Sequence, residues 1–419
     1  MLDNAFCRLR TLLAHSLARN IGWLFLFQIS TYLSFLLVIP WLTHVLPVSE
    51  YGAVMAVMAA AQFCFILTDY GFSASATYEV ARCRGDAIQV QDVIAQVHGA
   101  KIYLVVLACL GLWLLSMVPS YQAHGVLFVY AGFAVVFQAY QPVWLLQGLE
   151  NMKAYAIYMV AARFGFLFMV YAMVRDGGDG PLVMLAFALS NALGAGMGLW
   201  AMRYEGYRVL ALSVRGGLHL MLRSSGYFWG RLAFALYSSM NSVVLGGVSL
   251  AQAGIFNVAE QIYKAGQSVG GPISQAMLPA LTRSRNTRVL WKMLPALVAV
   301  LVLGCAAVAL LAPWAVRLAF GEHYQSSVPV LYIFLLTIPV TISGMVLGYP
   351  WFAAMGRPDL VNLTSVLAAG LHVCLLALLW WLGQLTAYNV ACCVLATEFF
   401  MLLLRLALGW RLVRIPSPK

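Results

Sequence analysis

The sequence predicts an all-α polytopic membrane protein with about twelve transmembrane helices. Of its 419 residues, 63% are hydrophobic and only 9% are charged, whereas soluble domains carry about 25% charged residues. A soluble fold could not bury so much apolar surface, so the lipid bilayer is the expected solvent. Apolar runs close to the roughly 20 residues that cross the hydrocarbon core follow one another along the whole chain.

Twelve such runs define the predicted helices and the domain boundaries. The runs cover residues 21–42, 53–76, 96–117, 125–147, 154–174, 181–202, 226–248, 254–278, 293–313, 328–350, 360–382 and 387–409. The longest predicted inside loop lies midway. We therefore expect an N-terminal lobe of six helices (1–202), a cytoplasmic linker (203–225) and a C-terminal lobe of six helices (226–419), a division common in transporters.

Positive charge gathers on one predicted side of the membrane. The chain has 25 Lys and Arg against 14 Asp and Glu, and nearly all the cations, Arg405 included, fall on one side of the twelve helices. The opposite side has only Arg175 and Arg317. Because cytoplasmic loops are enriched in Lys and Arg, both termini are predicted to be cytoplasmic. No basic run is interleaved with aromatic residues, so we expect no nucleic-acid partner.

The eighth run, 254–278, has a polar stripe. Its polar residues recur mainly at steps of three and four, which places them on one helical face: Asn257, Glu260, Gln261, Lys264 and Gln267. We interpret this face as lining a water-filled lumen, because polar groups in lipid are costly. The alternative stays open that Glu260 and Lys264 form a structural pair that binds nothing.

Other runs repeat the pattern more weakly. Gln28, Gln62, Gln138 and Asn241 each share a helical face with further polar residues. For any one of them, a hydrogen bond to a neighbouring helix is the simpler explanation. The number of helices involved is what predicts a central polar cavity walled by both lobes.

Several charged residues lie inside the runs, where a charge costs about 2.5–3.5 kcal/mol at the bilayer centre. The cations are Lys101, Arg163, Arg231 and Lys264, and the anions are Asp69, Glu260 and Glu398. The planar donors of a guanidinium match phosphate, so we interpret the cations as binding an anionic substrate group. The carboxylates are candidates for coupling transport to a proton or Na⁺.

The cations inside the runs have two alternative interpretations. The cations could simply neutralise the three carboxylates, and that alternative stays open. Lys101 is predicted about one turn inside the membrane, from where its side chain could snorkel to the cytoplasmic surface.

No catalytic signature occurs in the chain. A phosphate-binding loop of the form G-x-x-x-x-G-K-[ST] is absent. Asp176 and Asp179 form an acidic pair in a short outside turn, but Gly and Asp are common turn residues. We therefore predict no enzyme, no cofactor and no metal site.

Three segments resemble the Wzx-type O-antigen flippases. They are Leu67–Thr77 with Glu79–Arg82 at the end of the second run, Pro142–Met152 at the end of the fourth, and Gly254–Ile262 in the eighth. The resemblance extends over nearly the whole chain in helix number, loop lengths and total length. It implies membership of the multidrug, oligosaccharidyl-lipid and polysaccharide exporter superfamily, with two six-helix lobes around a central cavity open to one side at a time. That family has no consensus site signature, so the cavity residues above rest on membrane physics.

The resemblance also implies a substrate. It is an undecaprenyl-diphosphate-linked oligosaccharide repeat unit of O-antigen or a similar surface polysaccharide, flipped from the cytoplasmic to the periplasmic leaflet of the bacterial inner membrane. A polysaccharide polymerase and a chain-length regulator are the implied partner proteins, besides membrane lipid. Four alternatives remain. A cation-coupled multidrug exporter would have an acidic cavity, and a lipid II flippase would have more helices. A polysaccharide polymerase would need large outside loops, and the last alternative is a structural membrane subunit.

Overall fold

The structure, a computed structural model, describes residues 22–284, apart from 24, 25, 29, 32 and 35, and residues 288–414. Among these residues all regular elements are helical, and nine helical segments are long and apolar enough to cross a membrane. The predicted all-helical membrane fold is confirmed. Six residues of the first predicted run (21, 24, 25, 29, 32 and 35) and both chain ends (1–21 and 415–419) lie outside this description.

The helices follow the predicted runs closely. In chain order they are α2 (Val48–Asp69), α3 (Phe72–Arg82), α4 (Ala87–Ser116), α5 (Gly125–Ala139), α6 (Val143–Gly148), α7 (Met152–Met173), α8 (Gly180–Tyr204), α9 (Val214–Gly246), α10 (Leu250–Gln267), α11 (Gly270–Ser284), α12 (Arg288–Phe320), α13 (Ser327–Val346), α14 (Tyr349–Ala354), α15 (Asp359–Trp381) and α16 (Ala387–Arg414). Two short 3₁₀ turns, Pro119–His124 and Glu322–Tyr324, precede α5 and α13.

Four predicted runs are each divided into two helices. The divisions fall in the second and fourth runs of each half of the chain: α2/α3, α5/α6, α10/α11 and α13/α14. At the first of them Tyr70 and Gly71 take positive φ angles of 46° and 83°, which no α-helix can continue through. A Cβ on Gly71 would lie 2.9 Å from the Cβ of Tyr227, so a larger residue would not fit there. The matching positions of the breaks indicate an internal repeat.

Contacts group the described residues into two compact units. Unit 1 comprises the described residues up to Val45, Cys64–Met117 and His124–Phe228, and unit 2 comprises Leu46–Phe63, Val118–Ala123 and the described residues from Trp229 onward. The predicted lobe boundaries, 1–202 and 226–419, stay a proposal. Residues 214–225 of the predicted linker are helical, because they form the first part of α9.

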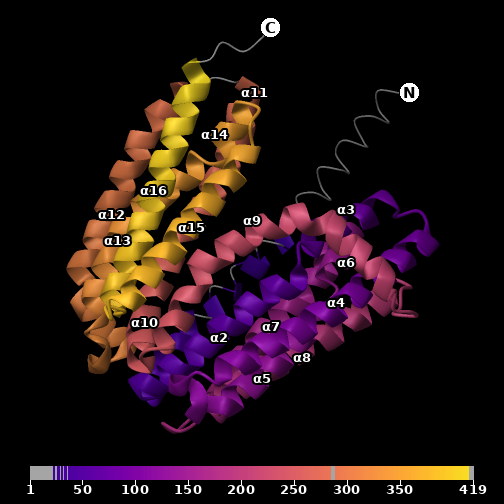
Figure 1. Cartoon of the computed structure of the whole chain (residues 1–419), viewed down its shortest axis with the longest axis horizontal. Helices are drawn as coiled ribbons and strands as arrows, with labels where there is room; N and C mark the ends of the chain where they lie inside the picture. Colours follow the sequence, from indigo (N-terminus) through magenta and orange to yellow (C-terminus); the bar gives the residue numbers. More distant parts are fainter. Residues whose placement is uncertain are drawn as a thin grey trace. The chain divides into compact units, whose positions relative to one another are not determined.

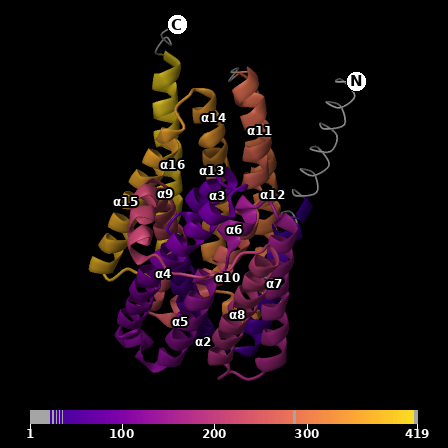
Figure 2. The same cartoon turned by 90° about the vertical axis from the view of Figure 1, so that its right-hand side faces the viewer.

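Unit 1 is a bundle in which α8 packs against both α5 and α7, and α4 packs against α5; Figures 1 and 2 show these four helices side by side. Its apolar core includes Phe72, Val97 and Trp144. The start of α9 docks tightly on α4, since a Cβ on Gly217 would overlap the backbone nitrogen of Ala100. Glycine therefore allows the two backbones to touch.

Unit 2 is built around α13, which packs against α10, α12 and α16, while α15 packs against α16 (Figure 1). The start of α2 lies on α10, where a Cβ on Gly52 would overlap the carbonyl of Leu250. α12 exposes large apolar side chains along its length, such as Leu303 (71%) and Leu310 (85%). An apolar surface of this extent is expected against lipid and not against water. The chain is therefore a multi-pass membrane protein.

Candidate functional site

Buried charge is concentrated in unit 2. Among the described residues, the charged side chains with less than a tenth of their surface exposed are Lys101 in unit 1 and Glu260, Glu398 and Arg405 in unit 2. In unit 2, polar side chains of α9, α10, α13, α15 and α16 hydrogen-bond to the buried charged residues or to one another. We call this set the buried polar network, and its members are Asn241, Tyr263, Thr341, Thr364, Ser365, His372, Thr397, Glu398 and Arg405.

Three predicted members of the polar stripe of α10 are buried or form an ion pair. Glu260 forms an ion pair with Lys264, Nζ to Oε2, at 3.0 Å, with 6% of the Glu260 side chain and 38% of the Lys264 side chain exposed. Asn257 is buried and accepts a hydrogen bond of 2.8 Å from the Tyr51 hydroxyl. Gln261 is half-buried. The Glu260–Lys264 pair is thus present, with its cationic end partly open.

Glu398 lies at the inner end of a chain of hydroxyl groups. The Tyr263 and Thr341 hydroxyls are 2.9 Å apart, and Thr341 hydrogen-bonds the Glu398 carboxylate. When the Glu398 carboxylate is ionised it only accepts, so Thr341 then donates to it and accepts from Tyr263. Half-buried Gln267 donates to the Tyr263 oxygen at 3.4 Å. The second carboxylate oxygen of Glu398 has no hydrogen-bond partner among the described residues, so it can receive a proton or a ligand.

Arg405 joins three helices beside Glu398. Its guanidinium donates to the carbonyl of Gly344 on α13 at 2.7 Å, and to the hydroxyls of Thr364 at 3.2 Å and Ser365 at 3.3 Å on α15. It lies close enough to Glu398 for their charges to interact. The sequence counts Arg405 among the cations of the cytoplasmic side; in the structure it lies on α16, which continues to Arg414, and it is buried among neighbouring helices.

His372 is fully buried between two polar side chains. Its Nε2 is 2.8 Å from Asn241 Oδ1, and its Nδ1 is 2.9 Å from the Thr397 hydroxyl oxygen. Asn241 Nδ2 donates to the Tyr237 carbonyl at 3.0 Å, so its oxygen faces the imidazole and accepts from Nε2–H. The Thr397 hydroxyl can donate to a neutral ring, or donate to the Cys393 carbonyl at 2.7 Å and accept from a protonated ring. Both protonation states therefore fit the same heavy-atom positions.

In unit 1 the predicted cations lie on α4 and α7. Lys101 is buried, and its ammonium donates to the carbonyl of Ala139, the last residue of α5. It does not snorkel to the surface, because its ammonium is buried against that carbonyl. Arg163 is half-buried on α7. Within the described part of the chain its guanidinium takes part in no ion pair.

The remaining predicted site residues are either exposed or half-buried. Gln28 and Arg231 are exposed, and Gln62 and Asp69 are half-buried on α2. Gln138 accepts from the Thr68 hydroxyl at 3.5 Å, and Asp69 accepts from the Ser73 hydroxyl at 3.0 Å. A hydrogen bond to a neighbouring helix, the simpler explanation for such a residue, is therefore present for Gln138.

Several network members escaped the sequence reasoning. His372 and Thr341 lie in apolar runs whose few polar residues give no stripe to detect, whereas Tyr263 lies between Glu260 and Gln267 of the predicted stripe and was not counted in it. For Arg405 the position inside run 387–409 was the available signal. Among the described residues no group of three or more His, Cys, Asp or Glu is placed to hold a metal ion. The network offers hydroxyl, imidazole and guanidinium groups, which suit proton transfer better than metal binding.

Comparisons with known proteins agree with this architecture. A family model described as "Polysaccharide biosynthesis protein" matches residues 17–285. A protein of Escherichia coli (strain K12) named "Putative O-antigen transporter" is 28% identical over 346 residues, which cover 78% of this chain and 81% of that protein.

Two solved structures have a similar fold. The inward-facing conformation of a multidrug resistance MATE family transporter of the MOP superfamily gives a TM-score of 0.70 at 14% identity, covering 94% of this chain and 98% of that one. Lipid II flippase MurJ in an inward closed conformation gives a TM-score of 0.73 at 12% identity, covering 91% of this chain and 87% of that one. The predicted exporter-superfamily fold is confirmed.

Proposed function

The chain belongs to the polysaccharide biosynthesis protein family, and from this premise we propose that it flips undecaprenyl-diphosphate-linked oligosaccharide repeat units from the cytoplasmic to the periplasmic leaflet. The name of the Escherichia coli relative, "Putative O-antigen transporter", supports a substrate of this class. A sugar headgroup loses many hydrogen bonds to water on entering lipid, and each unsatisfied group costs a few kcal/mol. Such a molecule does not cross a bilayer at a useful rate without a protein.

Transport is coupled to protons through the buried polar network of unit 2. The observation behind this proposal is the Glu398 carboxylate, buried with one oxygen unpartnered at the end of the Tyr263–Thr341 hydroxyl chain. His372, which accepts either protonation state without moving a heavy atom, supports a proton over Na⁺. Sodium would require several oxygen acceptors, whereas Arg405 and the Thr341 hydroxyl present donors. Glu260 and Asp69 are the further carboxylate candidates from the sequence.

Arg163, Arg231 and Lys264 are the candidate cations for the diphosphate group. Arg163 is half-buried without an ion pair among the described residues, and Lys264 keeps a partly exposed ammonium. We assign Lys101 to a structural role instead, since its ammonium already donates to the carbonyl at the end of α5. The inner membrane location, the cytoplasmic termini, and association with a polysaccharide polymerase and chain-length regulator belong to the same proposal.

The first test is complementation of a strain that lacks its own flippase and displays no surface polysaccharide. The wild-type chain restores the polysaccharide, whereas Arg163→Ala and Arg231→Ala, at equal membrane expression, lower its amount on gels. Arg175→Ala is the matched control, because Arg175 is exposed in the turn before α8. Wild-type polysaccharide in both variants would refute the assignment of these cations.

The second test uses proteoliposomes with a fluorescent undecaprenyl-diphosphate oligosaccharide. Flipping is measured by protection from a membrane-impermeant quencher, with and without an imposed pH gradient. We expect flipping to depend on the protein and to slow when the gradient collapses. Export of organic cations without movement of the lipid-linked oligosaccharide would instead favour the multidrug exporter.

A further inference from the structure

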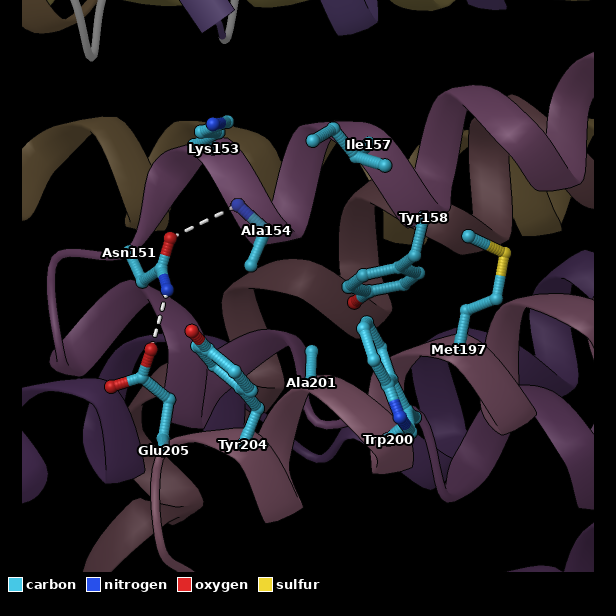
Figure 3. A pocket seen from close by; sticks show the side chains of 10 residues that line it. All are labelled: Asn151, Lys153, Ala154, Ile157, Tyr158, Met197, Trp200, Ala201, Tyr204 and Glu205. Atoms are coloured by element: carbon cyan, nitrogen blue, oxygen red, sulfur yellow. Dashed lines mark hydrogen bonds between the residues drawn. The ribbon is translucent and has the colours of Figure 1, made fainter.

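Unit 1 contains a cavity of about 290 Å³, and none of its lining residues belongs to the buried polar network. It is formed between the first turns of α7 and the last turns of α8 (Figure 3). Its apolar walls include Ala154 and Ile157 from α7 and Met197 and Ala201 from α8. The space is therefore built by helix ends, with an apolar interior and polar groups at its edge.

Aromatic rings at the mouth place this cavity at a membrane surface. Trp200 and Tyr204, on the last turns of α8, are 68% and 82% exposed, and their ring centroids are 6.2 Å apart. Exposed Trp and Tyr side chains at the ends of transmembrane helices typically lie at the level of the lipid headgroups. The charge distribution assigns this end of both helices to the cytoplasmic side.

The mouth has one group of each charge. The Glu205 carboxylate accepts a hydrogen bond of 2.6 Å from Asn151 Nδ2. The Asn151 oxygen in turn accepts from the backbone nitrogen of Ala154 at 3.0 Å, as the N-cap of α7. This arrangement holds Glu205 in place, with its other oxygen bonded to nothing else within the described residues. Lys153, exposed on the first turn of α7, supplies the cation. A ligand with an anionic and a cationic group is complementary to this pair.

Inside the cavity a buried hydroxyl has no partner. Tyr158 is 1% exposed, and its hydroxyl makes no hydrogen bond among the described residues. Figure 3 shows its ring projecting from α7 with the oxygen turned towards the side where Ala154 and Tyr204 lie. An unsatisfied buried hydroxyl costs about 1–3 kcal/mol, so a ligand oxygen that accepts from it would relieve this cost.

The volume limits the size of the ligand. Sites for small molecules span about 300–1,000 Å³, so this cavity stands at the lower end and fits a headgroup and not an oligosaccharide. Acyl chains attached to such a headgroup would lie outside, against exposed apolar surface such as Ile157 and Trp200.

We propose that this cavity binds the headgroup of a phosphatidylethanolamine molecule. Lys153 attracts the phosphate, the Tyr158 hydroxyl donates to a phosphate or ester oxygen, and Glu205 accepts from the ammonium. The choline headgroup has no N–H to donate to Glu205, and a phosphatidylglycerol headgroup has no cation. The site therefore discriminates among lipids by headgroup chemistry, independently of the flippase proposal.

Native mass spectrometry of the purified full chain tests this site. The protein is titrated in detergent with dioleoyl-phosphatidylethanolamine, -phosphatidylcholine and -phosphatidylglycerol, and the bound fraction is read for each lipid. We expect phosphatidylethanolamine to bind most tightly, and Glu205→Gln to weaken its binding about tenfold, because hydrogen bonds to charged groups are the stronger kind. Glu205→Gln should leave phosphatidylglycerol unchanged, and Tyr158→Phe should weaken all three.

Glu150→Gln is the matched control, since Glu150 is an exposed carboxylate one residue before Asn151 and faces Arg84 at 2.8 Å. It should bind phosphatidylethanolamine like the wild type. A photoreactive phosphatidylethanolamine should label peptides within 151–158 and 197–205. Equal binding of the ethanolamine and choline lipids, unchanged binding in Glu205→Gln, or labelling confined to other peptides would overturn the proposal.

Discussion

The two units bury charge in different ways. In unit 1 the buried cation, Lys101, bonds to the last carbonyl of α5, where a positive charge also interacts favourably with the helix dipole. In unit 2 the buried charges, Glu398 and Arg405, interact with hydroxyl and carbonyl groups of α13 and α15, and His372 on α15 hydrogen-bonds Asn241 and Thr397. The arrangement in unit 1 involves one hydrogen bond, between the Lys101 ammonium and a single carbonyl. The arrangement in unit 2 is extended and leaves one oxygen of Glu398 unpartnered within the described residues.

We interpret the buried charge of Lys101 as structural and those of unit 2 as functional. A cation at a helix end stabilises the fold without any change of state. In unit 2, the hydrogen bonds of His372 fit two protonation states and Glu398 has a free acceptor oxygen among the described residues, so both groups can respond to a proton. The contrast predicts that replacing Lys101 in unit 1 changes stability but not transport, whereas replacing Glu398 in unit 2 changes transport more than stability.

The largest expected effect is on stability, from Arg405→Ala. The substitution removes three hydrogen bonds and leaves the buried Glu398 charge uncompensated. Removing one member of a buried charged set typically costs about 3–5 kcal/mol. The free energy of unfolding in mixed micelles measures this change. Arg357→Ala, at the exposed ion pair with Asp359, is the control and should change it little; similar losses in both would contradict the described network.

Lys101→Met should cause the next largest effect. It leaves the Ala139 carbonyl without its buried donor, which costs about 1–3 kcal/mol. Because Lys101 acts locally in unit 1, flipping per folded molecule should stay at the wild-type level. The same unfolding titration and the proteoliposome assay measure the two quantities. A loss of flipping at full stability would return Lys101 to the substrate-binding cations that the sequence predicted.

Glu398→Gln should show the opposite pattern. The amide retains the hydrogen bond with Thr341 but cannot release a proton, so we expect pH-driven flipping to fall roughly tenfold, equal to about 1.4 kcal/mol in activation free energy. Stability should change less than in Arg405→Ala, because the Arg405 guanidinium keeps its three hydrogen bonds. Flipping rates at several imposed pH gradients, compared with those of Glu150→Gln, test this expectation. A Glu398→Gln protein that still responds fully to the gradient would move the coupling role to another residue, such as His372.

The smallest effect concerns a carboxylate at the surface of unit 1. Asp86 caps α4 by accepting from the backbone nitrogens of Ile88 and Gln89 at 3.0 and 3.1 Å, and the hydrogen bonds from Gln89 lower its pKa below the ordinary value of 3.8. A lowered folded-state pKa means that this stabilisation is present above the unfolded-state pKa and disappears as pH falls through the folded value.

Asp86→Asn isolates that contribution, because Asn also caps helices but does not titrate in this range. We therefore expect Asp86→Asn to lose slightly less stability than the wild type between pH 7 and pH 3. Thermal unfolding of both proteins at the two pH values measures this difference. Identical pH dependence in both proteins would show that the cap does not titrate as described.

Sequence reasoning located the helices well, because about 20 apolar residues in a row are a long and strong signal. One of the four divided runs has residues that disfavour a continuous helix, Gly270, Gly271 and Pro272, where α11 follows α10. The polar stripe on α10 was also recognisable, since Glu260 and Lys264 are four residues apart on one helix. Their ion pair at 3.0 Å follows directly from that spacing.

The sequence by itself therefore determined the membrane solvent, the helical class, the approximate ends of the helices and the local pairs on one helix face. Only the tertiary structure decided which distant residues meet: His372 with Asn241 across 131 positions, Arg405 with Gly344 across 61, and Tyr263 with Thr341 across 78. The physical reason is that local periodicity records how one helix turns, whereas a buried hydrogen bond depends on which helices pack together and at what height. An isolated Thr, Tyr or His in an apolar run gives no sign of its partner until the helices are side by side.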